Sequence, residues 1–200
     1  MREERIYGIV PTIEVVPLTE ENVTRLEAQA TLALNGTGRC DLDNMKRSCF
    51  AIEGCANGNP KALTLRGLLE DACHAFVAVA RTEQGVEFVG CVGFSKVNAG
   101  QQLFQFPPVE HPGFYLFRLC VAEEFRRHGV AAMLLNAARN IAHCHIYLVV
   151  ASKSESDVVR PYLKERADRL RQLYQSKMGF RLVSEGDMGC LMIKAPPPVM

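Results

Sequence analysis

Apolar and polar residues follow two different periods along the chain, and these periods predict the order of strands and helices. Short runs rich in Val, Ile and Phe indicate strands, and apolar residues that recur every three or four positions indicate helices. The expected strands cover residues 6–17, 74–81, 86–97, 114–121, 146–151, 180–184 and 189–194, and the expected helices cover residues 19–35, 62–73, 129–142 and 160–178. This order predicts an α/β (α+β) fold: a mixed, mostly antiparallel sheet of six or seven strands with helices on both faces.

Particular residues mark the ends and the irregular points of these elements. Thr19 precedes two glutamates, which is the pattern of a hydroxyl helix cap followed by acidic residues in the first turn. The turn at residues 82–85 joins two expected strands and predicts a hairpin. Gly90 and Gly93 lie inside an expected strand, where glycine indicates a bulge or a close approach by another group.

No repeat and no compositional break divides the chain, so we expect one domain over residues 1–200. Its core would span about residues 6–194. Residues 36–60 are rich in Gly and Asn and predict a loop insertion, and residues 98–112 predict a proline-bearing loop. The tail at residues 195–200 contains three consecutive prolines, which continue neither a helix nor a strand.

Composition and charge narrow the function classes. Hydrophobic residues make up 48% of the chain and its net charge is +1, so a full core can form and no global charge recruits nucleic acid or an acidic membrane. The apolar runs are far shorter than the ~20 residues that span a bilayer, and the charged first residues lead into no stretch typical of a signal peptide. We therefore expect a soluble, cytoplasmic protein without a membrane partner.

Eight cysteines raise the question of disulfides or a metal. Without an export signal we expect free thiols, several of them inside apolar runs, where cysteine packs as a small hydrophobe. Cys40, Cys49 and Cys55 are spaced more widely than the roughly two to four residues typical of paired zinc ligands. We therefore expect no metal site.

One short segment, RRHGVA at residues 126–131, follows an expected strand and opens an expected helix. The first N–H groups of a helix have no partner within the helix and carry partial positive charge, so such an end binds phosphate groups. Gly129 and Ala131 are small enough to let a pyrophosphate approach the backbone. The spacing fits neither a nucleotide-triphosphate loop nor a dinucleotide fingerprint. A helix that begins with two solvated arginines is the competing interpretation.

Two motifs, in this order, resemble those of the GNAT superfamily of N-acetyltransferases. The first is Leu-x-Val-x-Glu-x-x-Arg-x-x-Gly-x-Ala from Leu119 to Ala131, which is similar to the family's acetyl-CoA-binding motif. The second is LYQSKMGF at residues 173–180, which is similar to the hallmark Leu-Tyr-x-x-x-Gly-Phe. The gap between the motifs accommodates a helix, a strand and a second helix. The resemblance covers roughly residues 6–194 and implies the acyl-CoA N-acyltransferase fold.

The resemblance implies acetyl-CoA as co-substrate. In this family the cofactor lies where two neighbouring parallel strands separate, with its pantetheine arm along one strand and its pyrophosphate at the following helix. The residues implied in cofactor binding are Leu119, Cys120, Val121, Arg126, Arg127, His128, Gly129, Val130, Ala131 and Asp168. Asp168 and Ala167 stand where many members have an asparagine before the tyrosine.

The resemblance also implies direct attack of a neutral amine on the thioester carbonyl, which needs an acid for the leaving thiolate and a base for the amine. Tyr174 stands at the position of the general acid used by many members. A purely structural role on the helix face is the alternative. Glu123 is the candidate base within the first motif. Further candidates by position are Glu87, Glu110 and His111.

The acceptor and the function class stay open at this point. The acceptor would be a small-molecule amine or a peptide amine, and Glu185 and Asp187 would attract a cationic amine. A catalytically silent acyl-CoA-binding sensor or interaction module is the second hypothesis. A nucleic-acid surface on the arginines of residues 160–171 is less favoured, because the same helix carries Glu165 and Asp168. A homodimer is compatible with all of these.

Overall fold

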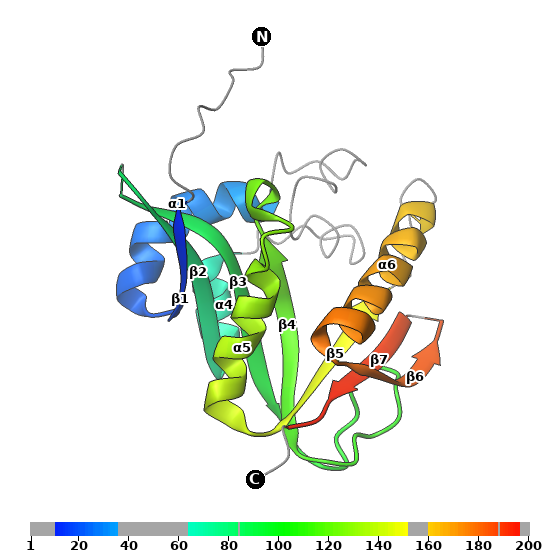
Figure 1. Cartoon of the computed structure of the whole chain (residues 1–200). Helices are drawn as coiled ribbons and strands as arrows, with labels where there is room; N and C mark the ends of the chain where they lie inside the picture. Colours follow the sequence, from blue (N-terminus) through cyan, green and yellow to red (C-terminus); the bar gives the residue numbers. More distant parts are fainter. Residues whose placement is uncertain (1–10, 36–63, 84, 152–159, 188, 197–200) are drawn as a thin grey trace.

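The computed structural model describes residues 11–35, 64–83, 85–151, 160–187 and 189–196. Seven strands form one sheet in the order β1-β2-β3-β4-β5-β7-β6 (Figure 1). The strands are β1 (Thr12–Pro17), β2 (His74–Thr82), β3 (Gly85–Val97), β4 (Gly113–Val121), β5 (His145–Ala151), β6 (Arg181–Gly186) and β7 (Gly189–Lys194). The helices are α1 (Glu20–Asn35), α4 (Leu65–Asp71), the short 3-10 helix η1 (Glu123–Phe125), α5 (Val130–Ala142) and α6 (Arg160–Met178).

The pairing confirms the predicted mixed, mostly antiparallel sheet. Strands β4 and β5 pair in parallel, and the other neighbouring strands of the described sheet pair antiparallel. The predicted hairpin at residues 82–85 joins β2 to β3. The first strand begins at Thr12, and its predicted start at residue 6 lies outside the described residues, as does the predicted insertion at residues 36–60.

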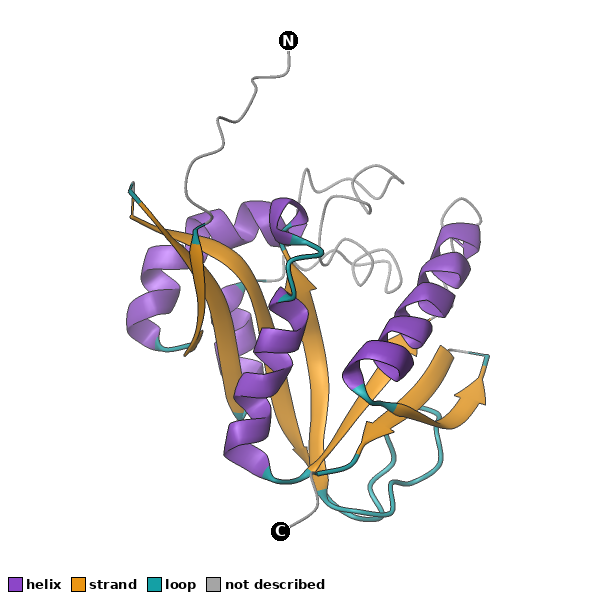
Figure 2. Cartoon of the chain, in the orientation of Figure 1, coloured by secondary structure: helices purple, strands orange, loops and turns teal. Residues whose placement is uncertain are grey.

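Helices cover both faces of the sheet, as predicted (Figure 2). Val130, Leu134 and Leu135 of α5 pack with Tyr174 of α6 on one face. On the other face, α1 and α4 bury a second cluster whose largest fully buried side chains include Leu26. The periodic apolar residues of each helix therefore face the sheet, as an amphipathic helix requires. Among the described helices, none is both long enough and apolar enough to cross a membrane.

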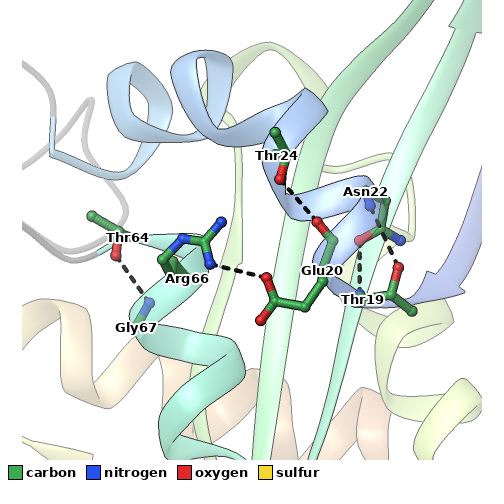
Figure 3. Close-up of polar contacts among 7 residues, drawn as sticks. All are labelled: Thr19, Glu20, Asn22, Thr24, Thr64, Arg66 and Gly67. Carbon is green, nitrogen blue, oxygen red and sulfur yellow. Dashed lines mark hydrogen bonds and ion pairs between the residues drawn. The ribbon is translucent and has the colours of Figure 1, made fainter.

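The beginnings of α1 and α4 are fixed by side-chain caps (Figure 3). Asn22 N–H donates to Thr19 Oγ1, and Thr19 N–H donates to Asn22 Oδ1, so the predicted cap at Thr19 is confirmed. In α4, Gly67 N–H donates to Thr64 Oγ1 at 3.0 Å. Arg66 then joins the two helices through an ion pair with Glu20 at 2.9 Å. Caps of this kind satisfy backbone donors that would otherwise have no partner.

The loop of residues 98–112 forms part of the core, which its sequence did not indicate. Leu103, Phe106 and Val109 are buried against Tyr147 of β5 and against β7. This loop covers the half of the sheet that α1 and α4 leave uncovered (teal in Figure 2). Because the three apolar residues are spaced without a helical or strand period, the pattern predicts a loop but not its burial.

Gly90 and Gly93 confirm the predicted close approach within β3. A Cβ at Gly90 would collide with the carbonyl oxygen of Cys120, and a Cβ at Gly93 would lie 2.6 Å from Leu68 Cδ1 and 2.8 Å from Phe117 Cζ. A backbone atom cannot move aside as the end of a flexible side chain can. Gly90 therefore holds β3 against the end of β4.

We expect Gly90→Ala to destabilise the protein by about 3 kcal/mol, at the upper end of the effect of overpacking a core. Gly93→Ala is the matched comparison and should cost less, because flexible side chains can move away from the new methyl group. Urea unfolding of both variants measures the difference. An equal or larger cost for Gly93→Ala would contradict the expectation.

Candidate cofactor-binding and active site

Strands β4 and β5 pair over only part of their length. Their parallel pairing begins at Gly113 and ends at Leu116, opposite Leu148. β4 then continues to Val121 with no partner strand on that side among the described residues, and Figure 1 shows the two strands diverging. A strand edge without a neighbouring strand can bind an extended chain that carries amide groups.

A β-bulge at Arg118 accounts for this separation. Cys91 lies opposite Cys120 and Gly93 lies opposite Phe117, so two residues of β4 face one residue of β3. Arg118 has a φ of +52°, and the Cys91 thiol lies 3.8 Å from its carbonyl oxygen. A bulge bends its strand and increases the local twist. It therefore turns the carboxyl half of β4 away from β5.

The turn after β4 is held by backbone contacts and by one arginine side chain. Ala122 N–H donates to the carbonyl of Val89 at 2.8 Å, and Phe125 N–H donates to the carbonyl of Ala122 at 3.0 Å. Arg126 Nε donates to the carbonyl of Val121 at 3.1 Å. The side chain of Arg126 thus fixes the end of the strand from within the first motif.

Helix α5 begins at Val130, one residue after the predicted start at Gly129. Arg126, Arg127 and His128 therefore precede the helix, although the sequence pattern predicted that the segment 126–131 opens it. The reason lies in the backbone: Arg127 has a φ of +70° and Gly129 a φ of +79°, and neither value is compatible with a right-handed helix. Gly129 occupies the cap position without a side-chain hydrogen bond.

The amino end of α5 is suited to an anion. Arg127, His128 and Gly129 are exposed, and a Cβ at Gly129 would meet no atom within 4 Å. The first N–H groups of a helix without a side-chain cap attract negative groups, and the helix dipole adds partial positive charge. The end of β4, η1 and this helix start therefore form one continuous candidate site.

Tyr174 lies in the apolar cluster that α5 and α6 bury on the sheet. Its side chain is 9% exposed, and its ring packs edge-on against Phe180 at 5.6 Å. Leu119 and Val121 of β4 pack against the same cluster. No hydrogen bond joins the Tyr174 hydroxyl to another part of the described chain. Burial raises the pKa of Tyr174 to about 12, although Arg166 opposes the shift.

The second motif matches the family hallmark with one extra residue. Four residues separate Tyr174 from Gly179, whereas Leu-Tyr-x-x-x-Gly-Phe has three. Counted back from Gly179, the tyrosine position falls on Gln175, which is exposed. One residue turns a side chain by about 100° around a helix. The residue that faces the sheet is therefore Tyr174, the tyrosine assigned to the motif from the sequence.

The pKa of Tyr174 makes a prediction for alkaline stability. An unfolded tyrosine ionises near pH 10 and the folded one near pH 12, so its contribution is present below pH 10 and is lost as the pH rises towards 12. We expect this single group to lower the free energy of unfolding by about 1.4 kcal/mol per pH unit in that window. Urea unfolding at pH 9, 10 and 11 should show a shallower decline for Tyr174→Phe. Parallel declines would show that Tyr174 ionises normally.

The other residues of the two motifs take different positions. Glu123 is exposed in the first turn of η1, one residue beyond the buried Ala122. Asp168 is exposed on α6, whereas its neighbour Ala167 is buried in the same cluster as Tyr174. Burial chiefly raises the pKa of the Cys190 thiol; Arg171 opposes the shift, and the carboxylates of Glu185 and Asp168 add to it.

The additional base candidates do not gather at one place. Glu110 and His111 precede Gly113, at the amino end of β4, whereas the first motif occupies the carboxyl end of the same strand. His111 stacks on His145 at 4.5 Å, and its carbonyl accepts a hydrogen bond from the Tyr147 hydroxyl at 2.9 Å. These residues are therefore about a strand length from Val121.

The charged residues predicted to attract an acceptor are partly neutralised. Glu185 accepts from Arg171 at 2.9 Å, an ion pair that links β6 to α6, and Asp187 is exposed. Arg169 lies 3.5 Å from Glu165, one turn away on α6. Helix α6 thus presents a mixed-charge face, which agrees with the preference for this interpretation of its sequence over a nucleic-acid surface.

The described part of the chain contains no group of three or more His, Cys, Asp or Glu side chains that could hold a metal ion. Cys40, Cys49 and Cys55 lie outside the described residues. Five described cysteines are free thiols: Cys73, Cys91, Cys120, Cys144 and Cys190.

The sequence pattern did not indicate the bulge at Arg118 or the exposure of Phe104. For the bulge, the available signal was a lone Arg inside an apolar strand.

Known structures share this fold. The chain is similar to Arabidopsis thaliana NAA60 in complex with acetyl-CoA, with a TM-score of 0.53 and 18% identity, covering 92% of this chain and 99% of that chain. It is also similar to an Escherichia coli GNAT family N-acetyltransferase (YhbS) in complex with CoA, with a TM-score of 0.50 and 13% identity, covering 94% and 84%. An aminoglycoside 6'-N-acetyltransferase complexed with coenzyme A gives a TM-score of 0.50 and 16% identity, covering 93% and 99%.

These likenesses show the fold, and the family rests on the sequence. Among curated proteins, none matches the chain. The family model described as "Acetyltransferase (GNAT) family" matches residues 45–180, which is more than half of the chain and includes both motifs. The chain therefore belongs to the GNAT family of acetyltransferases.

Proposed function

We propose that the protein transfers the acetyl group of acetyl-CoA to a primary amine by direct attack within a ternary complex. The observation that carries the proposal is the separation of β4 from β5 beyond Leu116, directly before an uncapped helix start at Val130. A strand edge without a neighbouring strand suits the amide-bearing pantetheine arm, and the helix start suits the pyrophosphate. Membership of the acetyltransferase family agrees with this use of the site.

The proposed contacts with acetyl-CoA follow the order of the chain. The backbone of Leu119, Cys120 and Val121 would pair with the pantetheine arm, and the N–H groups of residues 127–131 would bind the pyrophosphate. Arg126 would act indirectly, because its Nε holds the carbonyl of Val121. Arg127 would supply positive charge at the exposed start of α5.

In the proposed reaction, the amine nitrogen forms a bond to the thioester carbon, and the bond from that carbon to sulfur then breaks. A backbone N–H near Val121 would stabilise the negative charge that develops on the carbonyl oxygen. Tyr174 would protonate the departing thiolate. Because its pKa is about 12, Tyr174 carries its proton throughout the physiological pH range. Glu123, which is exposed, would receive the amine proton through water.

One observation favours a second candidate function. The Tyr174 side chain lies in an apolar cluster, which suits a residue that only packs. A protein with this site but without an acid would bind acyl-CoA and not turn it over. The two candidates therefore share the cofactor site and differ in catalysis.

The experiment that tests the proposal combines binding with turnover. Calorimetry measures acetyl-CoA affinity, and the release of free thiol from acetyl-CoA is then followed with alkylamines, polyamines, aminoglycosides and peptides. Binding together with amine-dependent thiol release supports acetyl transfer. Binding without release for any amine supports the silent module, and a lack of binding contradicts both.

A further inference from the structure

A row of aromatic side chains lies along β4 on the face opposite α5 and α6. Tyr115 stacks parallel to Phe117 with ring centres 6.2 Å apart, and Phe104 of the preceding loop meets Tyr115 edge-on at 5.7 Å. The Arg118 guanidinium lies over the Phe117 ring at 5.7 Å. We call these four residues the aromatic row. It ends at the bulge where β4 leaves β5.

The row lies at the boundary between two buried clusters. Phe117 packs against the cluster beneath α1 and α4, whereas Tyr115 packs against the cluster beneath the loop of residues 98–112. Both side chains are only partly buried. The aromatic surface of β4 therefore continues from the region under α1 and α4 to the region under the loop of residues 98–112, and neither buries it completely.

Phe104 is exposed at an energetic cost. Its side chain is 66% exposed, and its φ of +54° lies in the left-handed region, which bulky residues rarely adopt. The strained backbone and the exposure of an apolar ring to water each cost free energy, so packing within the described chain does not explain the position of Phe104. Contact with an apolar group of a bound molecule would explain it.

The Arg118 guanidinium is only partly used within the described chain. Its Nη2 pairs with Asp71 at 3.0 Å, but its buried Nη1 has no hydrogen-bond partner among the described residues. The side chain is 16% exposed, so the guanidinium lies at the boundary of the core. An unsatisfied buried donor is costly, which favours an oxygen acceptor supplied from outside.

The state of the guanidinium indicates which oxygen this would be. A carboxylate prefers the two-pronged fork of a free guanidinium, but Asp71 already compensates the charge and occupies Nη2. Because the charge is already compensated, a neutral carbonyl oxygen suits the Nη1 donor better than a second carboxylate. In the α-amine of a peptide, a carbonyl group is separated from the nitrogen by a single carbon atom. Holding that carbonyl at Arg118 would place the nitrogen beside the part of β4 that no longer pairs with β5.

We infer that the acceptor is a peptide α-amine whose first residue has a large apolar side chain. That side chain would pack on Phe104 and Tyr115, and the first carbonyl would accept from Arg118 Nη1. This inference rests on the proposed acetyl transfer and specifies its acceptor. Cationic polyamines fit less well, because they offer neither an apolar side chain for Phe104 and Tyr115 nor a carbonyl oxygen for Arg118.

The test compares two peptides that differ only in the first residue, Leu or Ser, by the rate of thiol release from acetyl-CoA. We expect the wild-type protein to prefer the Leu peptide about tenfold in kcat/KM, the usual scale for an apolar side chain in a pocket. Phe104→Ser should raise KM for the Leu peptide about tenfold and leave the Ser peptide and acetyl-CoA affinity unchanged. Val183→Ser, which alters another exposed apolar residue, on β6, should change neither the preference for the Leu peptide nor its KM.

A second pair of acceptors tests Arg118. Phenylalanine amide and phenethylamine differ by the carbonyl group, so the wild-type protein should favour the amide and Arg118→Lys should abolish that preference. Equal rates for the Leu and Ser peptides, or a Phe104→Ser variant with unchanged preference, would overturn the inference while acetyl transfer to other amines still supported the proposed function. Thiol release with none of the amines would overturn the proposed function itself.

Discussion

Gly129→Glu is expected to lower acetyl-CoA affinity by at least about a hundredfold while the protein remains folded. The new carboxylate would stand at the cap of α5, where the pyrophosphate is proposed to bind. Opposing like charges in a binding site costs several kcal/mol, and each 1.4 kcal/mol is about tenfold in affinity. Nothing lies within 4 Å of the new Cβ, so the side chain meets no steric obstacle in the folded chain.

Gly100→Glu provides a matched control for this variant. Gly100 has the same φ of +79°, and a Cβ there also meets nothing within 4 Å, but it lies in the loop between β3 and β4. Both variants should lose about 1 kcal/mol of stability from the left-handed backbone. Calorimetry with acetyl-CoA should then show a loss of affinity for Gly129→Glu alone. Equal affinities would place the pyrophosphate elsewhere.

Tyr174→Phe is expected to lower kcat by about 10²–10⁴-fold, which is the usual contribution of a general acid. Acetyl-CoA affinity should not change. Stability should also be retained at neutral pH, because the hydroxyl makes no hydrogen bond within the described residues and the ring packing against Phe180 is kept. Steady-state kinetics, calorimetry and urea unfolding measure the three quantities.

Tyr147→Phe is the matched comparison. Tyr147 is buried too, but its hydroxyl donates to the carbonyl of His111 at 2.9 Å, near the amino end of β4. Removing it should cost about 1 kcal/mol of stability and leave kcat unchanged. If Tyr174→Phe retained full activity, the hydroxyl would have only a packing role, and the thiolate would take its proton from water.

Most helices and strands could be predicted because their patterns are local. The predicted helix over residues 160–178 matches α6, and the central strand predicted from Phe114 matches β4 within one residue. The start of α5 was predicted within one residue, whereas the helix predicted over residues 62–73 is shorter at both ends in α4 (Leu65–Asp71). Thr64 caps its start, and Ala72 already has an extended backbone. Arg127 has a positive φ that its residue type does not indicate, whereas a glycine such as Gly129 does.

Part of the candidate site could also be predicted from local sequence patterns, and part of it could not. The first motif could be located from its sequence, since its strand, turn and helix start are consecutive along the chain. The relation of Tyr174 to that motif could not, because it depends on how α6 rotates about its axis when it packs on the sheet. The extra residue before Gly179 left two candidates, and burial distinguishes Tyr174 from the exposed Gln175.

The sequence by itself determined the order of elements, the capped helix start at Thr19, the glycines of β3 and the membership of the acetyltransferase family. These depend on periodicity, capping groups and the spacing of motif residues within short stretches of chain. Only the tertiary structure decided where β4 leaves β5, which side chain of α6 faces the sheet, and that Phe104 and Arg118 end one aromatic row. Each of these depends on contacts between residues far apart in the chain, whose geometry no local pattern specifies.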